Sequence, residues 1–205
     1  MANIKILADS RKLSGYCVAG KDIDSNKWIR IVSNRPGGAL DWKEKRFIDK
    51  NGNNSNDPLL KILEIQLKEA APLLYQPENY LLTNSIWKES SISNWDVKFD
   101  KPSDLWGDGD RISQEQINNG SKKIFQSLYI VKVNNVDLYY TNFGGKIKRR
   151  IKFVYNSINY DLGATMDNKI FDEIQHKERE HNNIIVVSLG EPFKGYHFKL
   201  VASIF

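Results

Sequence analysis

Alternation of apolar and polar residues with a period of two dominates this chain and predicts β-strands. In "LLKILEIQLK", residues 59–68, the apolar side chains of Leu63, Ile65 and Leu67 alternate with charged and amide side chains. This is the pattern of a strand with one buried face. The last segment, "YHFKLVASI", residues 196–204, alternates in the same way.

Two further segments predict hairpins. In "SLYIVKVNNVDLYY" we expect the chain to turn at Asn134 and Asn135, because asparagine tolerates a positive φ. "IKFVYNSINYDL" predicts a second hairpin that turns at Asn156 and Ser157. Helical patterns are scarce. The best is "MDNKIFDEIQHKERE", residues 166–180, with a narrow apolar stripe, and a shorter one lies within "SQEQINNGSKKIF".

Residues 78–121 have a different texture, rich in Asn, Ser, Asp and Gly, but they include Trp87, Trp95 and Trp106. Tryptophans in polar surroundings usually pack a loop onto a core, with base stacking as the alternative. We therefore predict a mainly β protein of two small β-barrels, a packed irregular connector and one or two short helices. The expected boundaries are 1–85, 86–122 and 123–205.

Composition supports a globular protein. The chain has 205 residues, of which 40% are hydrophobic and 27% charged. No apolar run is long enough to span a bilayer, so we expect a cytoplasmic protein without a membrane partner. Cys17 is the single cysteine, which excludes an intramolecular disulfide and cysteine-based metal sites. His176 and His181 are five positions apart and would diverge around a helix, so no metal or other cofactor is expected.

The net charge of +5 is a mild excess that suits an anionic partner. It is concentrated in "GGKIKRRIKFVY", where five of the seven residues 146–152 are basic. As a strand, this segment places Lys148, Arg150 and Lys152 on one face. Such a row of cations can follow a phosphate backbone. The alternative is a solvated face, or an edge strand that its charges protect from pairing.

The sequence gives little support for catalysis, and no catalytic residue is predicted. "GDGDRIS" supplies Asp108 and Asp110, which could hold magnesium, but it lacks the calcium-loop spacing. A P-loop, a dinucleotide fingerprint and a Gly-x-Ser-x-Gly motif are all missing. Cys17 is more typical of a buried thiol than of a nucleophile, and no local signature pairs it with His197 or His181 as a base.

Several blocks of the chain, in order, carry a family resemblance. They are "ILADSRKLSGYCVAGKDI", "KWIRIVS", "YQPENY", "LWGDGDRIS", "SLYIVKV", "KRRIKFVYNSINYDL" and "SLGEPFKGYHFKLVASI". Together, over residues 4–204, the chain resembles bacterial dual OB-containing domain proteins. The resemblance implies two OB-type barrels, a fold often used to bind oligonucleotides, and an accessory or sensor module around prokaryotic defence and nucleic-acid metabolism. With the missing catalytic motifs, we expect this module to be non-catalytic. Its partner would be single-stranded nucleic acid or a nucleotide; the alternatives are an adaptor for a partner protein and an enzyme acting on a nucleotide or nucleic acid.

An OB barrel binds single strands across one sheet face, with aromatic rings stacking on bases and cations contacting phosphates. The candidate residues in this chain are aromatic or basic and lie in three separate segments. They are Arg11, Lys12, Tyr16, Trp28, Arg30, Lys148, Arg150, Lys152, Tyr155 and Lys199. A structural alternative stands beside each, because Trp28 also suits a core and Arg11 or Arg30 could pair with Asp9, Asp22 or Glu78.

"SLGEPFKGYHFKL", residues 188–200, predicts a turn between two paired strands near the C-terminus. The motif residues we expect to matter structurally are Ser188, Gly190, Glu191, Pro192, Phe193, Gly195 and Tyr196. Glycine supplies backbone freedom in such a turn and proline fixes φ. We expect Phe193 to pack back onto the barrel, so that its truncation would destabilise the fold.

Overall fold

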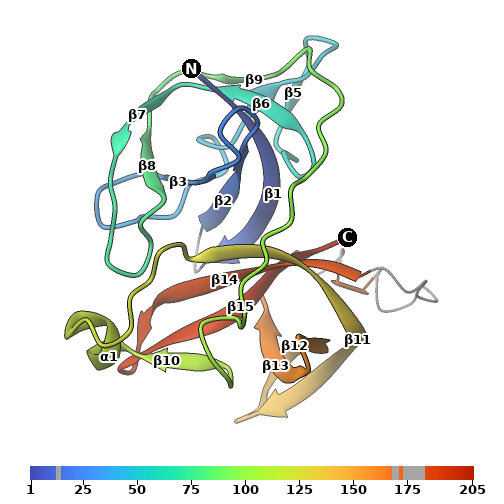
Figure 1. Cartoon of the computed structure of the whole chain (residues 1–205). Coiled ribbons are helices and arrows are strands. Elements are labelled where there is room, and N and C mark those ends of the chain that lie inside the picture. Colours follow the sequence, from blue (N-terminus) through green and yellow to red (C-terminus); the bar gives the residue numbers. More distant parts are fainter. Residues whose placement is uncertain (13–14, 168–170, 173–182) are drawn as a thin grey trace. The chain divides into compact units, whose positions relative to one another are not determined.

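A computed structural model of the chain describes residues 1–12, 15–167, 171–172 and 183–205 (Figure 1). It is built mainly from strands, as the alternating pattern predicts. The chain divides into two compact units, which we call unit 1, Met1–Lys98, and unit 2, Phe99–Phe205.

Unit 1 is a curved sheet that closes on itself. Its strands are β1 (Ala2–Lys12), β2 (Gly15–Asp22), β3 (Trp28–Val32), β4 (Phe47–Ile48), β5 (Asn54–Ser55), β6 (Ile62–Ile65), β7 (Leu67–Ala70), β8 (Asn79–Leu82) and β9 (Trp87–Glu89). The order β6-β1-β2-β3-β8-β7 runs through antiparallel pairs except β3 and β8, which are parallel. Only Gln66 separates β6 from β7, so one continuous segment pairs with both β1 and β8 and closes the barrel.

The core of unit 1 collects the inward residues of these strands. Ile4, Ile6 and Leu63 are fully buried, and Phe47 and Trp87 join them from the short parallel pair of β4 and β9. Burial of these side chains is the main favourable term in the folding of the unit. Trp87 therefore packs into a core, as the loop-packing interpretation predicts.

Unit 2 contains the longer strands. They are β10 (Arg111–Ser113), β11 (Leu128–Phe143), β12 (Lys146–Tyr155), β13 (Ile158–Ala164), β14 (Asn183–Phe193) and β15 (Tyr196–Ile204), and the short helix α1 (Gln114–Asn118) follows β10. Strands β11, β12, β13, β15 and β14 pair in that order, and β14 pairs again with β11. The result is a closed five-stranded barrel in which only β13 and β15 are parallel.

This strand order, 1-2-3-5-4 back to 1, is that of an OB barrel, and unit 1 follows it with β1, β2, β3, β8 and the β6–β7 segment. The predicted class, a mainly β protein of two OB-like barrels, is confirmed. In unit 2 the fully buried side chains of Ile151, Leu162 and Val187 fill the interior. Phe153 stacks on Tyr160 there, with ring centroids 5.4 Å apart.

All three tight hairpins of unit 2 use two-residue turns with positive φ at both positions. These turns are Gly144–Gly145, Asn156–Ser157 and Lys194–Gly195. Such turns match the right-handed twist of the strands. The predicted turn at Asn156 and Ser157 is confirmed.

The predicted turn at Asn134 and Asn135 is wrong. β11 continues through it, and the pairing with β12 shifts between Asn134 and Asp137. Asn135 does have a positive φ of 53°, but this conformation makes a bulge that bends the strand. Figure 1 shows β11 as a long, curved strand.

Residues 86–122, expected as a connector, are divided between the units. β9 pairs with β6 and β4 in unit 1, whereas β10 and α1 belong to unit 2. The predicted short helix in 113–125 is confirmed as α1. The helix predicted over 166–180 lies largely outside the described residues. Within this range, Phe171 and Asp172 are described and are helical.

Candidate nucleic-acid interface

Exposed aromatic rings gather at the tip of the β14–β15 hairpin in unit 2. Phe193 is 61% exposed and Tyr196 is 41% exposed. Both rings lie near Phe198, with centroids 6.4 and 6.5 Å away. The guanidinium of Arg111 lies over two of the rings, 4.8 Å from the centroid of Tyr196 and 5.7 Å from that of Phe198. We call Arg111, Phe193, Lys194, Tyr196 and Phe198 the tip cluster.

Local structure explains why the tip cluster faces solvent. Residues alternate along β15, so the side chains of His197 and Lys199 are buried while Tyr196 and Phe198 point the other way. β10 pairs with β15 and sets Arg111 opposite Phe198. Phe193 pairs across the turn with Tyr196, which places both rings beside each other. The expectation that Phe193 packs onto the barrel is therefore corrected, because its ring is mostly exposed.

A shallow groove borders the tip cluster. Tyr196, Lys194 and Gly195 form one side, and the other side comes from the end of β10 and from α1. Its polar lining residues are Ser113, Gln114, Glu115, Asn118 and Asn119. Carboxamide groups donate and accept hydrogen bonds at once, so this groove can meet the edge of a base whose face stacks on Tyr196.

The predicted basic face of β12 is confirmed as the outer face of the barrel. Ile151, Phe153 and Tyr155 point inward and are buried, while Lys148 and Lys152 are exposed. Register sets Lys148 opposite Thr141 and Lys152 opposite both Asp137 and Asp161.

Arg150, between these lysines, is already bound within the sheet. Its guanidinium Nε lies 2.8 Å from Asp161 Oδ1, and a second nitrogen donates to the Asp161 carbonyl at 2.6 Å. Tyr139 donates its hydroxyl to Asp161 Oδ2 at 2.6 Å, and the Lys152 ammonium lies 4.7 Å from the Tyr139 ring centroid. Burial and the hydrogen bond to Asp161 raise the pKa of the Tyr139 hydroxyl. Arg150 therefore orders this face, and the two exposed lysines add further positive charge to it.

The basic face adjoins the strand that carries the tip cluster. Arg150 pairs with Gly163 on β13, and Gly163 pairs with Leu200 on β15, two positions along the same face from Phe198. A Cβ on Gly163 would lie 3.3 Å from Leu200 Cδ2. Glycine at this position therefore leaves room for the Leu200 side chain on the outer face. In an OB barrel the second and third strands and the loop between the fourth and fifth are the usual ligand-binding elements. In unit 2 these are β12, β13 and the β14–β15 turn.

Lys199, expected to contact nucleic acid, points inward instead. Its residue is 1% exposed, and its ammonium donates to the carbonyls of Gly107 and Asp108 at 2.5 and 2.9 Å. The ring of Tyr160 lies below it, with the centroid 5.5 Å away. Burial lowers the pKa of Lys199 to about 8. Lys199 thus anchors the "GDGD" loop, whose carbonyls bind an ammonium of the chain itself.

The pKa of Lys199 predicts a pH dependence of stability. The folded protein releases the Lys199 proton near pH 8, whereas the unfolded chain holds it to about 10.5. The unfolded state therefore binds more protons in this window, and the free energy of unfolding rises with pH. We expect wild type to gain stability relative to Lys199→Met from pH 8 to 10, measured by urea denaturation. The tyrosines also titrate in this pH range, but their contribution is the same in both proteins and cancels when the free energy of unfolding of Lys199→Met is subtracted from that of wild type. A difference that is flat or falls with pH would contradict the role given to Lys199.

Three other predicted contacts are also buried. Tyr155 is 8% exposed and donates its hydroxyl to the Pro102 carbonyl at 2.7 Å, so its ring belongs to the core of unit 2. Trp28 is 6% exposed, and the Lys21 ammonium lies 5.5 Å from its ring centroid. Arg30 is 4% exposed and forms an ion pair with Glu78 at 3.3 Å. For these residues the structural alternative explains the geometry.

Arg11 and Tyr16 do come together in unit 1. They are opposite each other on β1 and β2, and the Arg11 guanidinium lies 4.6 Å from the ring centroid of Tyr16. The ammonium of Lys45 approaches the same ring at 3.9 Å and pairs with Asp9 at 2.5 Å. The side chain of Lys12 lies outside the described residues.

The described residues contain no group of three His, Cys, Asp or Glu side chains that could hold a metal ion. His176 and His181 lie outside them. Cys17 is a free, half-buried thiol in unit 1. Among the residues that the structure describes, no helix is both long enough and apolar enough to cross a membrane.

Sequence reasoning missed Arg111 as a binding candidate and assigned the exposed rings of the tip cluster to the fold. One signal was available. Phe193, Tyr196 and Phe198 flank a Lys-Gly turn, and alternation puts Tyr196 and Phe198 on the face opposite His197 and Lys199. The pairing of β10 with β15, which brings in Arg111, joins residues 83 to 87 positions apart and leaves no local pattern.

The two barrels place the chain in the class of proteins with two OB folds. In the second barrel, aromatic and basic side chains lie on the elements that OB folds usually use for binding. The model of the family described as the dual OB-containing domain matches residues 2–204. The chain therefore belongs to the dual OB-containing domain family. No curated protein matches the sequence. The OB fold is one that commonly binds oligonucleotides.

Proposed function

We propose that unit 2 binds single-stranded nucleic acid without catalysing a reaction on it. The observation that carries this proposal is the tip cluster, in which Phe193 and Tyr196 are exposed beside a stacked arginine at the β14–β15 turn. Exposed aromatic rings beside cations are the usual means of binding unpaired bases. A duplex hides the faces of its bases, so it would gain only the phosphate contacts.

In this proposal the two parts of the surface have different tasks. Rings of the tip cluster stack on bases, and the lysines on the outer face of β12 contact phosphates. The groove lined by Gln114 and Asn118 offers hydrogen bonds to one base edge. Affinity then depends on salt through the lysines and much less through the rings.

The experiment is a fluorescence anisotropy titration of the purified chain with labelled single-stranded RNA, single-stranded DNA and duplex, each at low and near-physiological salt. We expect single strands to bind more tightly than duplex, with affinity that falls as salt rises. Equal binding of duplex and single strands would reject stacking, and absence of binding at low salt would reject the proposal.

The same titration tests the lysines of β12. We expect Lys148→Gln/Lys152→Gln to weaken single-strand binding and to reduce the slope of log K against log salt by roughly 1.4, since each phosphate contact contributes about 0.7. The matched control is Lys101→Gln/Lys123→Gln, which removes two exposed charges elsewhere in unit 2. Equal slopes in the two variants would exclude β12 as the phosphate contact. Arg150 is left unchanged because its ion pair with Asp161 holds the sheet face in shape.

A further inference from the structure

Unit 1 has a pocket whose lining includes none of the residues predicted from the sequence to bind nucleic acid. It has a volume of about 230 Å³ and lies between the segment before β4 and the turn after β8. Two cations and several neutral polar groups line it: Lys43, Arg46, Asn54, Thr83, Asn84 and Ser85. Cations, hydroxyls and carboxamides together are the donor set that binds phosphate oxygens.

An exposed tryptophan stands next to the two cations. Trp42 is 51% exposed. The Lys43 ammonium lies 5.7 Å from its ring centroid and the Arg46 guanidinium carbon lies 5.4 Å from it. Because both cations also line the pocket, they connect it to the face of the tryptophan. A large exposed ring flanked by cations is typical of a binding surface.

The charge of the pocket is positive. Glu44 is the carboxylate in its lining, and Glu44 Oε2 accepts the backbone N–H of Asp41 at 2.7 Å. Asp41 Oδ1 in return accepts the N–H groups of Lys43 and Glu44 at 2.6 and 2.7 Å. This reciprocal bonding fixes the backbone that carries Lys43 and uses part of the hydrogen-bonding capacity of Glu44.

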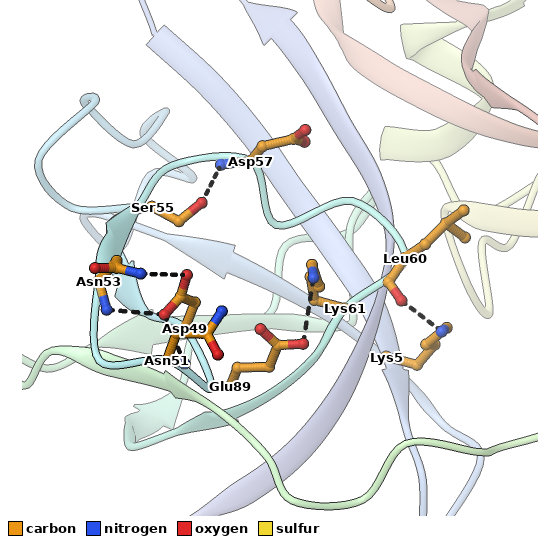
Figure 2. Close-up of polar contacts among 9 residues, drawn as sticks. All are labelled: Lys5, Asp49, Asn51, Asn53, Ser55, Asp57, Leu60, Lys61 and Glu89. Carbon is orange, nitrogen blue, oxygen red and sulfur yellow. Dashed lines mark hydrogen bonds and ion pairs between the residues drawn. The ribbon is translucent and has the colours of Figure 1, made fainter.

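The opposite walls are also fixed by hydrogen bonds. Thr83 donates to the Gln66 carbonyl at 2.9 Å and accepts the N–H of Ser85 at 3.3 Å. Asn54 is on β5, and the β4–β5 turn before it is ordered by Asp49, as Figure 2 shows. Asp49 Oδ1 accepts the N–H groups of Asn51 and Asn53 at 2.9 and 2.8 Å, and the bond from Asn53 is the main cause that lowers the pKa of Asp49.

We propose that this pocket binds a nucleoside phosphate, with the phosphate between Lys43 and Arg46 and the base stacked on Trp42. The size of the pocket supports a phosphate inside it and a base outside it. Pockets that enclose a drug-sized ligand have roughly 300–1,000 Å³, so this smaller one suits the phosphate and part of the sugar. The base then remains outside, next to the half-exposed side chain of Trp42.

The site is in unit 1, and the proposal does not rest on the function proposed for unit 2. A nucleoside phosphate has two sources, a free nucleotide and the 5′-phosphorylated end of an oligonucleotide. Both present the same terminal phosphate and stackable base.

The test is isothermal titration calorimetry of the full chain with AMP, adenosine and inorganic phosphate. We expect AMP to bind more tightly than either of the other two, because it alone uses both parts of the site. Lys43→Gln/Arg46→Gln should weaken AMP binding by about tenfold or more, and Trp42→Ala should weaken AMP binding by about tenfold while it leaves phosphate binding unchanged. The control Lys27→Gln/Lys50→Gln removes two exposed charges of unit 1 outside the pocket and should match wild type.

Absence of AMP binding at millimolar concentration overturns the proposal, and so does equal binding by Lys43→Gln/Arg46→Gln and the control. The source is assigned in a Phe193→Ala/Tyr196→Ala background, in which the tip cluster no longer stacks on bases. There, tighter binding of a 5′-phosphorylated than of a 5′-hydroxyl oligonucleotide identifies a strand end as the ligand. Equal binding of the two, with AMP still bound, supports a free nucleotide.

Discussion

Phe193→Ala/Tyr196→Ala weakens binding of single-stranded oligonucleotides by about 30-fold or more. Stacking of a base on an aromatic ring contributes about 1–3 kcal/mol, so the loss of two rings costs at least about 2 kcal/mol, and each 1.4 kcal/mol is a factor of ten. Phe193 is 61% exposed and Tyr196 is 41% exposed, and the two residues pair across the turn, so the free energy of unfolding should fall by about 1 kcal/mol or less, the contribution of a cross-strand aromatic pair. The readouts are fluorescence anisotropy for binding and urea denaturation for stability.

Phe125→Ala is the matched control for this variant. Phe125 is 85% exposed and lies in unit 2 outside the tip cluster. It removes an exposed ring without changing the β14–β15 hairpin, so its binding should equal that of wild type. If both variants lose the same affinity, the tip cluster has no special part in binding. If the double variant unfolds, Phe193 and Tyr196 support the fold, as the sequence alone predicts for the motif.

Glu78→Ala has the largest expected effect on stability. Its carboxylate pairs with Arg30 at 3.3 Å, and the two side chains are only 6% and 5% exposed. Removal of one partner leaves a buried guanidinium without its counter-charge, which typically costs about 3–5 kcal/mol. We expect a loss of this size in the free energy of unfolding of unit 1, measured by urea denaturation and followed by tryptophan fluorescence.

An exposed ion pair in the same unit serves as the comparison. Arg35 and Glu69 are 2.9 Å apart, and their side chains are 66% and 44% exposed. Glu69→Ala should cost about 1 kcal/mol or less, since exposed pairs contribute little. Equal losses in Glu69→Ala and Glu78→Ala would show that burial does not set the role of Arg30. A loss of oligonucleotide binding by Glu78→Ala at unchanged stability would return Arg30 to the list of binding residues.

The sequence predicted best what depends on local alternation. The row of Lys148, Arg150 and Lys152 follows from the period of two along β12, because the buried side chains of residues 151, 153 and 155 fix which face points outward. Arg150 shows the limit of this reasoning. Its ion pair with Asp161 depends on the register of β12 against β13, which alternation does not specify. Its charge is therefore not as available as the pattern indicates.

Positions that depend on distant segments could not be predicted. The side chain of Lys199 is held inside by the "GDGD" loop, about 90 residues earlier in the chain, whose carbonyls accept its hydrogen bonds. The other face stays open and carries Tyr196. Asparagines with positive φ suit both a turn and a bulge, so Asn134 and Asn135 indicated a turn where β11 bends. Trp42 stands in no periodic segment, and only the fold reveals its exposure.

The most direct test of the proposed function is an NMR titration of the ¹⁵N-labelled full chain with an unlabelled single-stranded oligonucleotide. If unit 2 binds single strands as proposed, we expect the largest chemical-shift changes on Arg111, on residues 193–198 and on residues 148–152, all in unit 2. Shifts that avoid these segments, or no shifts at saturating oligonucleotide, would contradict it.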